Sequence, residues 1–223
     1  MTITSHSLAK YLQRSTWRGR YGLSDSIFLV GDDLIEASSA AAEFFFNLAF
    51  YNANQGMPVL MRGAITLGEV REVRAIFPET AKQNLVGEAV VRAVRPEKSG
   101  AKGPRLLISA EVAQTLKTSK LNGLLDTTGE GGAAELLWLL SPDIADSNGL
   151  LIGDVMAVAV RLALGARRGS AAFEHLVAYL DLGLRSLSRL KRDLPEAAEM
   201  VIKKGSHPET SSPVGSSVCF AWG

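Results

Sequence analysis

Short apolar runs and helically spaced apolar positions alternate along the first two thirds of the chain, which is typical of a mixed α and β protein. Residues 26–30, Ser-Ile-Phe-Leu-Val, form a β-branched and aromatic run between polar neighbours and predict a buried strand. Apolar residues then recur on one face of a helix that runs through Ala53, and this face predicts packing against a sheet. Either Asp32 or Asp33 is placed to cap the start of that helix. The same reasoning predicts strands over residues 59–66, 75–77, 105–108 and 135–140, and a helix over residues 87–94. Ser109 is expected to cap a further helix that runs to about Lys117.

The pattern changes after residue 145, where long helical segments replace the short elements. Residues 150–166 and 170–191 predict two helices joined by a Gly-Ala-Arg-Arg-Gly turn, which indicates an antiparallel pair, and a third helix is expected after them. The longest apolar stretch, residues 149–166, contains Asp154 and Arg161, and burying either charge in lipid would be costly. We therefore expect a first domain over residues 1–145, a helical extension over residues 146–205 and a disordered tail over residues 206–223.

Composition indicates a globular protein of a reducing compartment. The 223 residues are 47% hydrophobic and 21% charged, which is enough to bury a core and too apolar for a disordered chain. A single cysteine, Cys219, excludes an internal disulfide and a cysteine-based zinc site, and the 3 scattered histidines do not supply a metal cluster. The first residues lack the basic and apolar regions of a signal peptide, so we expect a cytoplasmic protein.

The net charge of +1 hides an uneven distribution of charge. The 24 basic and 23 acidic side chains nearly cancel, which excludes a polybasic binder of nucleic acid or of a membrane surface. Residues 57–120, however, hold eleven basic and six acidic side chains, whereas residues 121–223 hold nine basic and twelve acidic ones. This basic excess either forms a solvated face or holds a polyanionic small molecule.

Three short segments carry residues suited to phosphate chemistry. Asp25 stands directly before the first predicted strand, where a carboxylate is either a turn residue or a ligand for Mg²⁺. Gly63 and Gly68 flank a predicted strand, and they mark either a bulge or a place where another group approaches the backbone closely. Arg92 and Arg95 stand three residues apart on a short helix, where they form either exposed ion pairs or a clamp for an anion.

In this order, the segments resemble the class III nucleotide cyclase catalytic domain. That family shows Gly-Asp before a strand, then Arg-x-Gly-Ile-x-x-Gly, then Gly-x-x-Val-Asn-x-Ala-x-Arg-x-Glu, and then a strand ending in Ser. Three segments of the sequence are most similar to the compact bacterial branch that contains the Pycsar anti-phage pyrimidine cyclases. They are Ser-Asp-Ser-Ile, Arg-Gly-Ala-Ile-Thr-x-Gly-Glu and Pro-Arg-Leu-Leu-Ile-Ser. The resemblance covers about residues 17–140, and its third and fourth motifs are matched at Gly87, Val90, Ala93, Arg95 and Glu97 and over residues 106–109.

The resemblance implies an α/β (α+β) fold with a ferredoxin-like class III cyclase core and a C-terminal helical extension. It implies an enzyme that converts a nucleoside triphosphate, UTP or CTP, to its 3′,5′-cyclic monophosphate and pyrophosphate, as a second-messenger synthase in bacterial anti-phage defence. Asp25 falls on one of the two aspartates that hold two Mg²⁺ or Mn²⁺ ions in the family, and Arg95 falls on the catalytic arginine that neutralises phosphate charge. Asn84 falls on a position that reads the base, and Arg92 would bind the substrate beside Arg95.

The resemblance also implies partners and exposes departures from the family. We expect a homodimer with its site at the interface, where Arg95 acts across from Asp25, and a separate effector that responds to the cyclic nucleotide. Neither nucleic acid nor a membrane is an expected partner. The family's first strand and helix, with the other metal-binding aspartate, are not found in the sequence, and Val91 replaces the asparagine that orients the ribose. The alternative is a cyclase-like module that binds a nucleotide or a partner without turnover.

Overall fold

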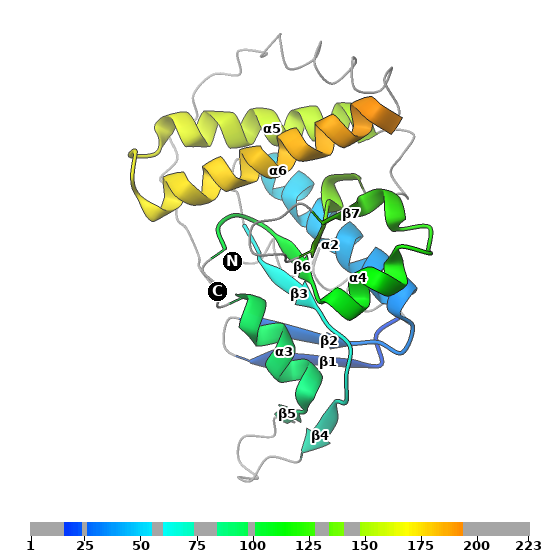
Figure 1. Ribbon diagram of the computed structural model, residues 1–223. Helices are drawn as coiled ribbons and strands as arrows, with labels where there is room; N and C mark the ends of the chain where they lie inside the picture. Colours follow the sequence, from blue (N-terminus) through cyan, green and yellow to red (C-terminus); the bar gives the residue numbers. More distant parts are fainter. Residues whose placement is uncertain are drawn as a thin grey trace.

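The computed structural model describes residues 16–23, 26–54, 60–73, 84–97, 101–127, 134–140 and 148–193. Within these ranges, strands and helices are interspersed up to residue 140, and two further long helices follow (Figure 1). The mixed α+β class predicted from the sequence is therefore confirmed.

The helices begin and end close to where the apolar pattern predicts. Asp33 Oδ1 accepts a hydrogen bond from the Glu36 amide at 2.9 Å, so Asp33 rather than Asp32 caps the first long helix. Ser109 Oγ accepts one from the Val112 amide at 3.4 Å and caps another, as predicted. The helices are α2 (Leu34–Asn54), α3 (Glu88–Glu97), α4 (Ala110–Leu116), α5 (Asn148–Gly165) and α6 (Ala171–Asp193).

Within the described ranges, the strands form one four-stranded sheet and two antiparallel pairs. In the four-stranded sheet, β3 (Gly63–Ile65) runs parallel to β6 (Leu106–Ile108), and β8 (Ala134–Leu136) runs antiparallel to β6 and to β7 (Leu125–Asp126). The pairs are β1 (Gly19–Leu23) with β2 (Ser26–Val30), and β4 (Arg71–Val73) with β5 (Asn84–Val86). Because β3 and β6 are parallel, their carboxyl ends meet, and the Ser109 amide donates to the Ile65 carbonyl at 3.1 Å.

Two strand predictions differ from the structure. The strand predicted over residues 135–140 is wrong beyond Leu136, because the chain there turns into a single 3-10 turn, η4 (Trp138–Leu140). This turn buries the indole of Trp138, whose Nε1 donates to the Pro104 carbonyl at 2.7 Å. The strand predicted over residues 59–66 is described from residue 60, and of its described residues only those of β3 pair. The predicted strand over residues 75–77, the loop over 129–132 and the predicted helix after residue 193 lie outside the described residues.

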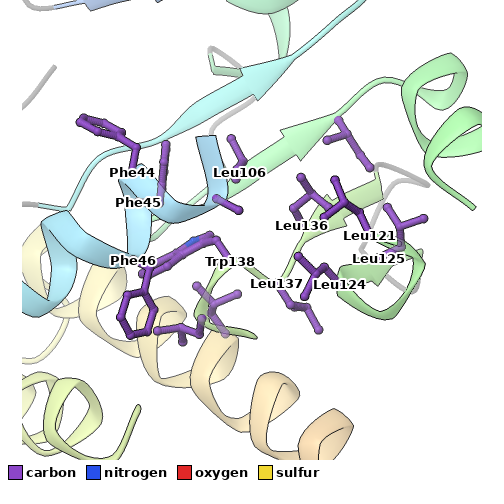
Figure 2. Close-up of a cluster of buried hydrophobic side chains, with 14 of the residues drawn as sticks. Phe44, Phe45, Phe46, Leu106, Leu121, Leu124, Leu125, Leu136, Leu137 and Trp138 are labelled. Atoms are coloured by element: carbon purple, nitrogen blue, oxygen red, sulfur yellow. The ribbon is translucent and has the colours of Figure 1, made fainter. Parts of the chain in front are cut away.

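One hydrophobic cluster joins α2, the four-stranded sheet and the two long helices (Figure 2). The Phe45 ring of α2 lies 5.8 Å from the Trp138 ring, which in turn lies 6.0 Å from the Tyr179 ring of α6. The predicted antiparallel pair is confirmed, since α5 and α6 lie side by side and α5 also packs against α2 (Figure 1). In the described part of the chain, no helix is both long enough and apolar enough to cross a membrane.

Candidate functional site

An open pocket of about 450 Å³ lies where β3, α3 and α4 meet. The end of β3 reaches it from one side and the start of α4 from another, because β3 and β6 are neighbouring parallel strands. The helix α3 supplies the basic side chains. The pocket is lined by Thr66, Arg92, Arg95, Ser109, Ala110 and Glu111.

Two glycines hold α3 close to the end of β3. Gly68 and Gly87 have φ values of +150° and +138°, which side-chain-bearing residues rarely adopt. A Cβ on Gly87 would collide with the carbonyl group of Glu69, so a larger residue has no room there. The Ala89 amide donates to the Glu69 carbonyl at 3.4 Å, and Thr66 Oγ1 donates to the Ala89 carbonyl at 2.9 Å. The loop after β3 and the first turn of α3 are thus fixed to each other.

Arg92 is half-buried and bridges two carboxylates. Its Nη2 lies 2.6 Å from Glu88 Oε1, one turn earlier on α3, and its Nη1 lies 2.7 Å from Glu111 Oε2 on α4. The two contacts use different nitrogens of one guanidinium group. Charge on Arg92 is therefore largely compensated in the protein alone.

Arg95 stands one turn further along α3 and is exposed. Within the described ranges, no hydrogen bond or ion pair of Arg95 is found. Ser109 adds a hydroxyl group to the same pocket, and its oxygen accepts from the Val112 amide, which leaves its proton for another acceptor. The pocket thus combines a hydroxyl donor with a cation that has no partner among the described residues, and this pair of groups suits a phosphate oxygen.

Of the two other predicted site residues, the structure describes Asn84, which does not line this pocket. Asp25 lies outside the described residues, so its prediction as a metal ligand stays a prediction. Asn84 opens β5 opposite Val73 of β4, and β5 leads through a tight turn into α3. On β4, Glu72 accepts a hydrogen bond from the Tyr21 hydroxyl of β1, and this bond raises the pKa of Tyr21 above its usual range.

A metal site cannot be assembled from the side chains that the structure describes. Among them, no three His, Cys, Asp or Glu residues come together in a way that could hold an ion. The residues that the structure adds to the site are Thr66 and Glu111, which sequence reasoning missed as pocket residues because their nearness to α3 depends on the pairing of β3 with β6.

Comparison of the chain with family models, curated proteins and solved structures found no match. Three segments that lie far apart in the sequence contribute to the pocket: the end of β3, the helix α3 and the turn after β6.

Proposed function

We propose that this chain is a nucleotide cyclase of the class III type, with a ferredoxin-like core, that acts on UTP or CTP. In the proposed reaction, the 3′-oxygen of the nucleoside triphosphate attacks its own α-phosphorus. A bond forms between the 3′-oxygen and phosphorus, and the bond from phosphorus to the bridging oxygen of the β-phosphate breaks. Pyrophosphate leaves with that electron pair, and the proton of the 3′-hydroxyl passes to a base.

The observation that carries the proposal is the meeting of the cyclase-like motifs around one pocket. Thr66 comes from the segment that resembles the family's second motif, Arg92 and Arg95 from the third, and Ser109 from the closing strand. If these short motifs matched the family only by chance, their residues would not be expected to line one pocket. Their convergence, with an exposed arginine among them, supports a site for a phosphorylated substrate.

Each pocket residue has a role that its chemistry allows. Arg95 would neutralise the charge that develops on the α-phosphate oxygens, which is a stabilisation that acts in the transition state. Ser109 would donate a hydrogen bond from its hydroxyl group to a phosphate oxygen. In the proposed homodimer, Asp25 of one protomer would hold a Mg²⁺ or Mn²⁺ ion across from Arg95 of the other. The cyclic nucleotide would then act on a separate effector in anti-phage defence.

Pyrophosphate release tests this proposal. The full chain is incubated with each of the four nucleoside triphosphates and Mn²⁺, and pyrophosphate and cyclic product are measured. We expect turnover of a pyrimidine triphosphate, and Arg95→Ala should lower kcat by about 100-fold or more, since a positioned donor to transition-state charge contributes about 10²–10³ in rate. Asp25→Ala should abolish activity. The matched control is Arg167→Ala, an exposed arginine in the turn between α5 and α6 that should leave kcat unchanged.

Val91 favours a second candidate function, a module that binds a nucleotide without turnover. It stands where the family has a ribose-orienting asparagine, and its side chain is 54% exposed at the surface of α3. A hydrocarbon side chain cannot hydrogen-bond a ribose hydroxyl. If the protein is stabilised by nucleotide and no triphosphate yields pyrophosphate, the cyclase proposal is wrong and this module takes its place. At 100 times Kd the stabilisation would be about 2.7 kcal/mol, which thermal unfolding detects.

A further inference from the structure

Arg92 and Glu111 both line the pocket, and their side chains contact each other. Glu111 lines the pocket and is 57% exposed, and its carboxylate lies 2.7 Å from the Arg92 guanidinium, which also lines it. A carboxylate on a guanidinium nitrogen occupies the place where a phosphate oxygen would bind. The pocket of the free protein therefore already holds an anion of its own.

We propose that Glu111 is a built-in competitor for the anion site, and that a phosphorylated ligand displaces it from Arg92. This inference rests on the proposed function only in taking a phosphorylated ligand as the pocket's occupant. Glu111 then weakens the binding of phosphate groups and speeds the release of a phosphorylated ligand. It is a positioning residue, since it acts through Arg92.

The geometry allows one contact to break while the other stays. Arg92 uses Nη1 for Glu111 and Nη2 for Glu88, so releasing Glu111 leaves the side chain anchored to its own helix. Glu88 stands four residues before Arg92 on α3 and does not line the pocket. Exposed ion pairs of this kind are weak, because water solvates both partners, and a ligand can displace one.

Charge decides how strongly Glu111 opposes each ligand. An anion that binds between Arg92 and Arg95 must tolerate the Glu111 carboxylate nearby, and the repulsion increases with the charge on the ligand. An uncharged nucleoside meets no such repulsion. Salt screens the interaction between exposed charges, so the effect shrinks as the ionic strength rises.

Isothermal titration of the full chain with uridine, UMP, UTP and inorganic pyrophosphate tests the inference. In 50 mM salt, we expect Glu111→Gln to bind UTP and pyrophosphate about 10-fold more tightly than the wild type, a change of about 1.4 kcal/mol. UMP should gain less and uridine nothing, and the gain should shrink in 500 mM salt. The matched control is Glu88→Gln, which removes the other carboxylate from Arg92 and should change these affinities less than twofold.

The outcomes separate this inference from the cyclase proposal. Equal affinities of wild type and Glu111→Gln for pyrophosphate, or an equal gain in Glu88→Gln, overturn the role of Glu111. Absence of binding of every phosphorylated probe to both proteins also overturns it. Tighter binding in Glu111→Gln without any cyclic product supports the inference and overturns the cyclase proposal instead. Thermal unfolding of each variant checks that its fold is intact. The titrations and this control are repeated with Glu111→Ala.

Discussion

His175 on α6 is a buried histidine whose ring accepts a hydrogen bond. Its side chain is 8% exposed, and its Nδ1 accepts from the Gly103 amide at 3.0 Å. Burial lowers the pKa of His175 below its ordinary value of 6.5, and the positive charges of Arg62 and Lys102 lower it further, while Glu174 opposes them. The ring is thus neutral in the folded protein at pH 7, and only the neutral ring can accept this bond.

Protonation of His175 should therefore destabilise the fold. The unfolded chain takes up the proton near pH 6.5 and the folded chain only at lower pH, so the free energy of unfolding is fully retained above pH 6.5 and falls below it. The slope is at most about 1.4 kcal/mol per pH unit. We expect His175→Asn, which keeps an acceptor in place, to flatten the dependence between pH 6.5 and 5. Urea unfolding at several pH values measures it, and identical slopes in both proteins would contradict the assignment.

At the scale of single residues, interactions between neighbours in the sequence are predicted better than interactions between residues of different elements. The caps at Asp33 and Ser109 follow from residue type and from a neighbouring apolar pattern. The ion pair between Arg92 and Glu111 joins side chains 19 residues apart on different helices. Sequence spacing shows that Glu88 can reach Arg92, but it does not show that Glu111 can.

Among the elements, α3 depends most on a single turn. Gly87 joins β5 to α3 with a φ of +138°, and a Cβ there would collide with the Glu69 carbonyl. Backbone cannot move aside as a flexible side chain can. The position of α3, and with it both pocket arginines, therefore depends on the absence of a side chain at this residue.

Three glycine substitutions separate crowding from backbone strain. We expect Gly87→Ala to lose about 2–4 kcal/mol of unfolding free energy, because it adds both a strained φ and a steric clash. Gly169→Ala, at a φ of +77° with open space around it, should lose about 1 kcal/mol. Gly123→Ala, with neither constraint, should change stability by at most about 0.5 kcal/mol. Thermal unfolding ranks the three variants, and a Gly87→Ala protein as stable as Gly123→Ala would contradict this account.

The sequence predicts elements where a periodic pattern is long enough to read. The helices α2, α5 and α6 and the strand β2 follow from such patterns. By contrast, β4 and β5 have three residues each and β7 has two, which is too short for an alternation to be recognised. The apolar residues that follow β8 are buried in a 3-10 turn, so burial alone does not distinguish a turn from a strand there.

Across the whole molecule, a group of charged side chains fastens α6 to the sheet. Glu135 of β8 is fully buried, and its Oε2 lies 2.8 Å from Arg105 Nη2 and 3.0 Å from Arg185 Nη1. Arg185 also pairs with Asp126 of β7 and with Asp181 of its own helix. Burial alone would lower the pKa of Arg185, but the neighbouring carboxylates outweigh it and raise that pKa above its usual range. The arginine is thus charged, and it compensates the buried carboxylate.

Removing Arg185 should therefore destabilise the described part of the chain as one unit. Arg185→Met leaves the carboxylates of Glu135 and Asp126 without one of their cations, and we expect a loss of about 2–4 kcal/mol, since a buried charge that loses its partner is costly. Asp181→Asn is the control: it removes the exposed partner, 63% accessible, of the same arginine. It should cost less than about 0.5 kcal/mol.

Because α5 and α6 share their hydrophobic cluster with the sheet, circular dichroism and tryptophan fluorescence should report one urea transition in both variants. A separate, earlier loss of helix in Arg185→Met would show instead that the helix pair unfolds independently of the sheet.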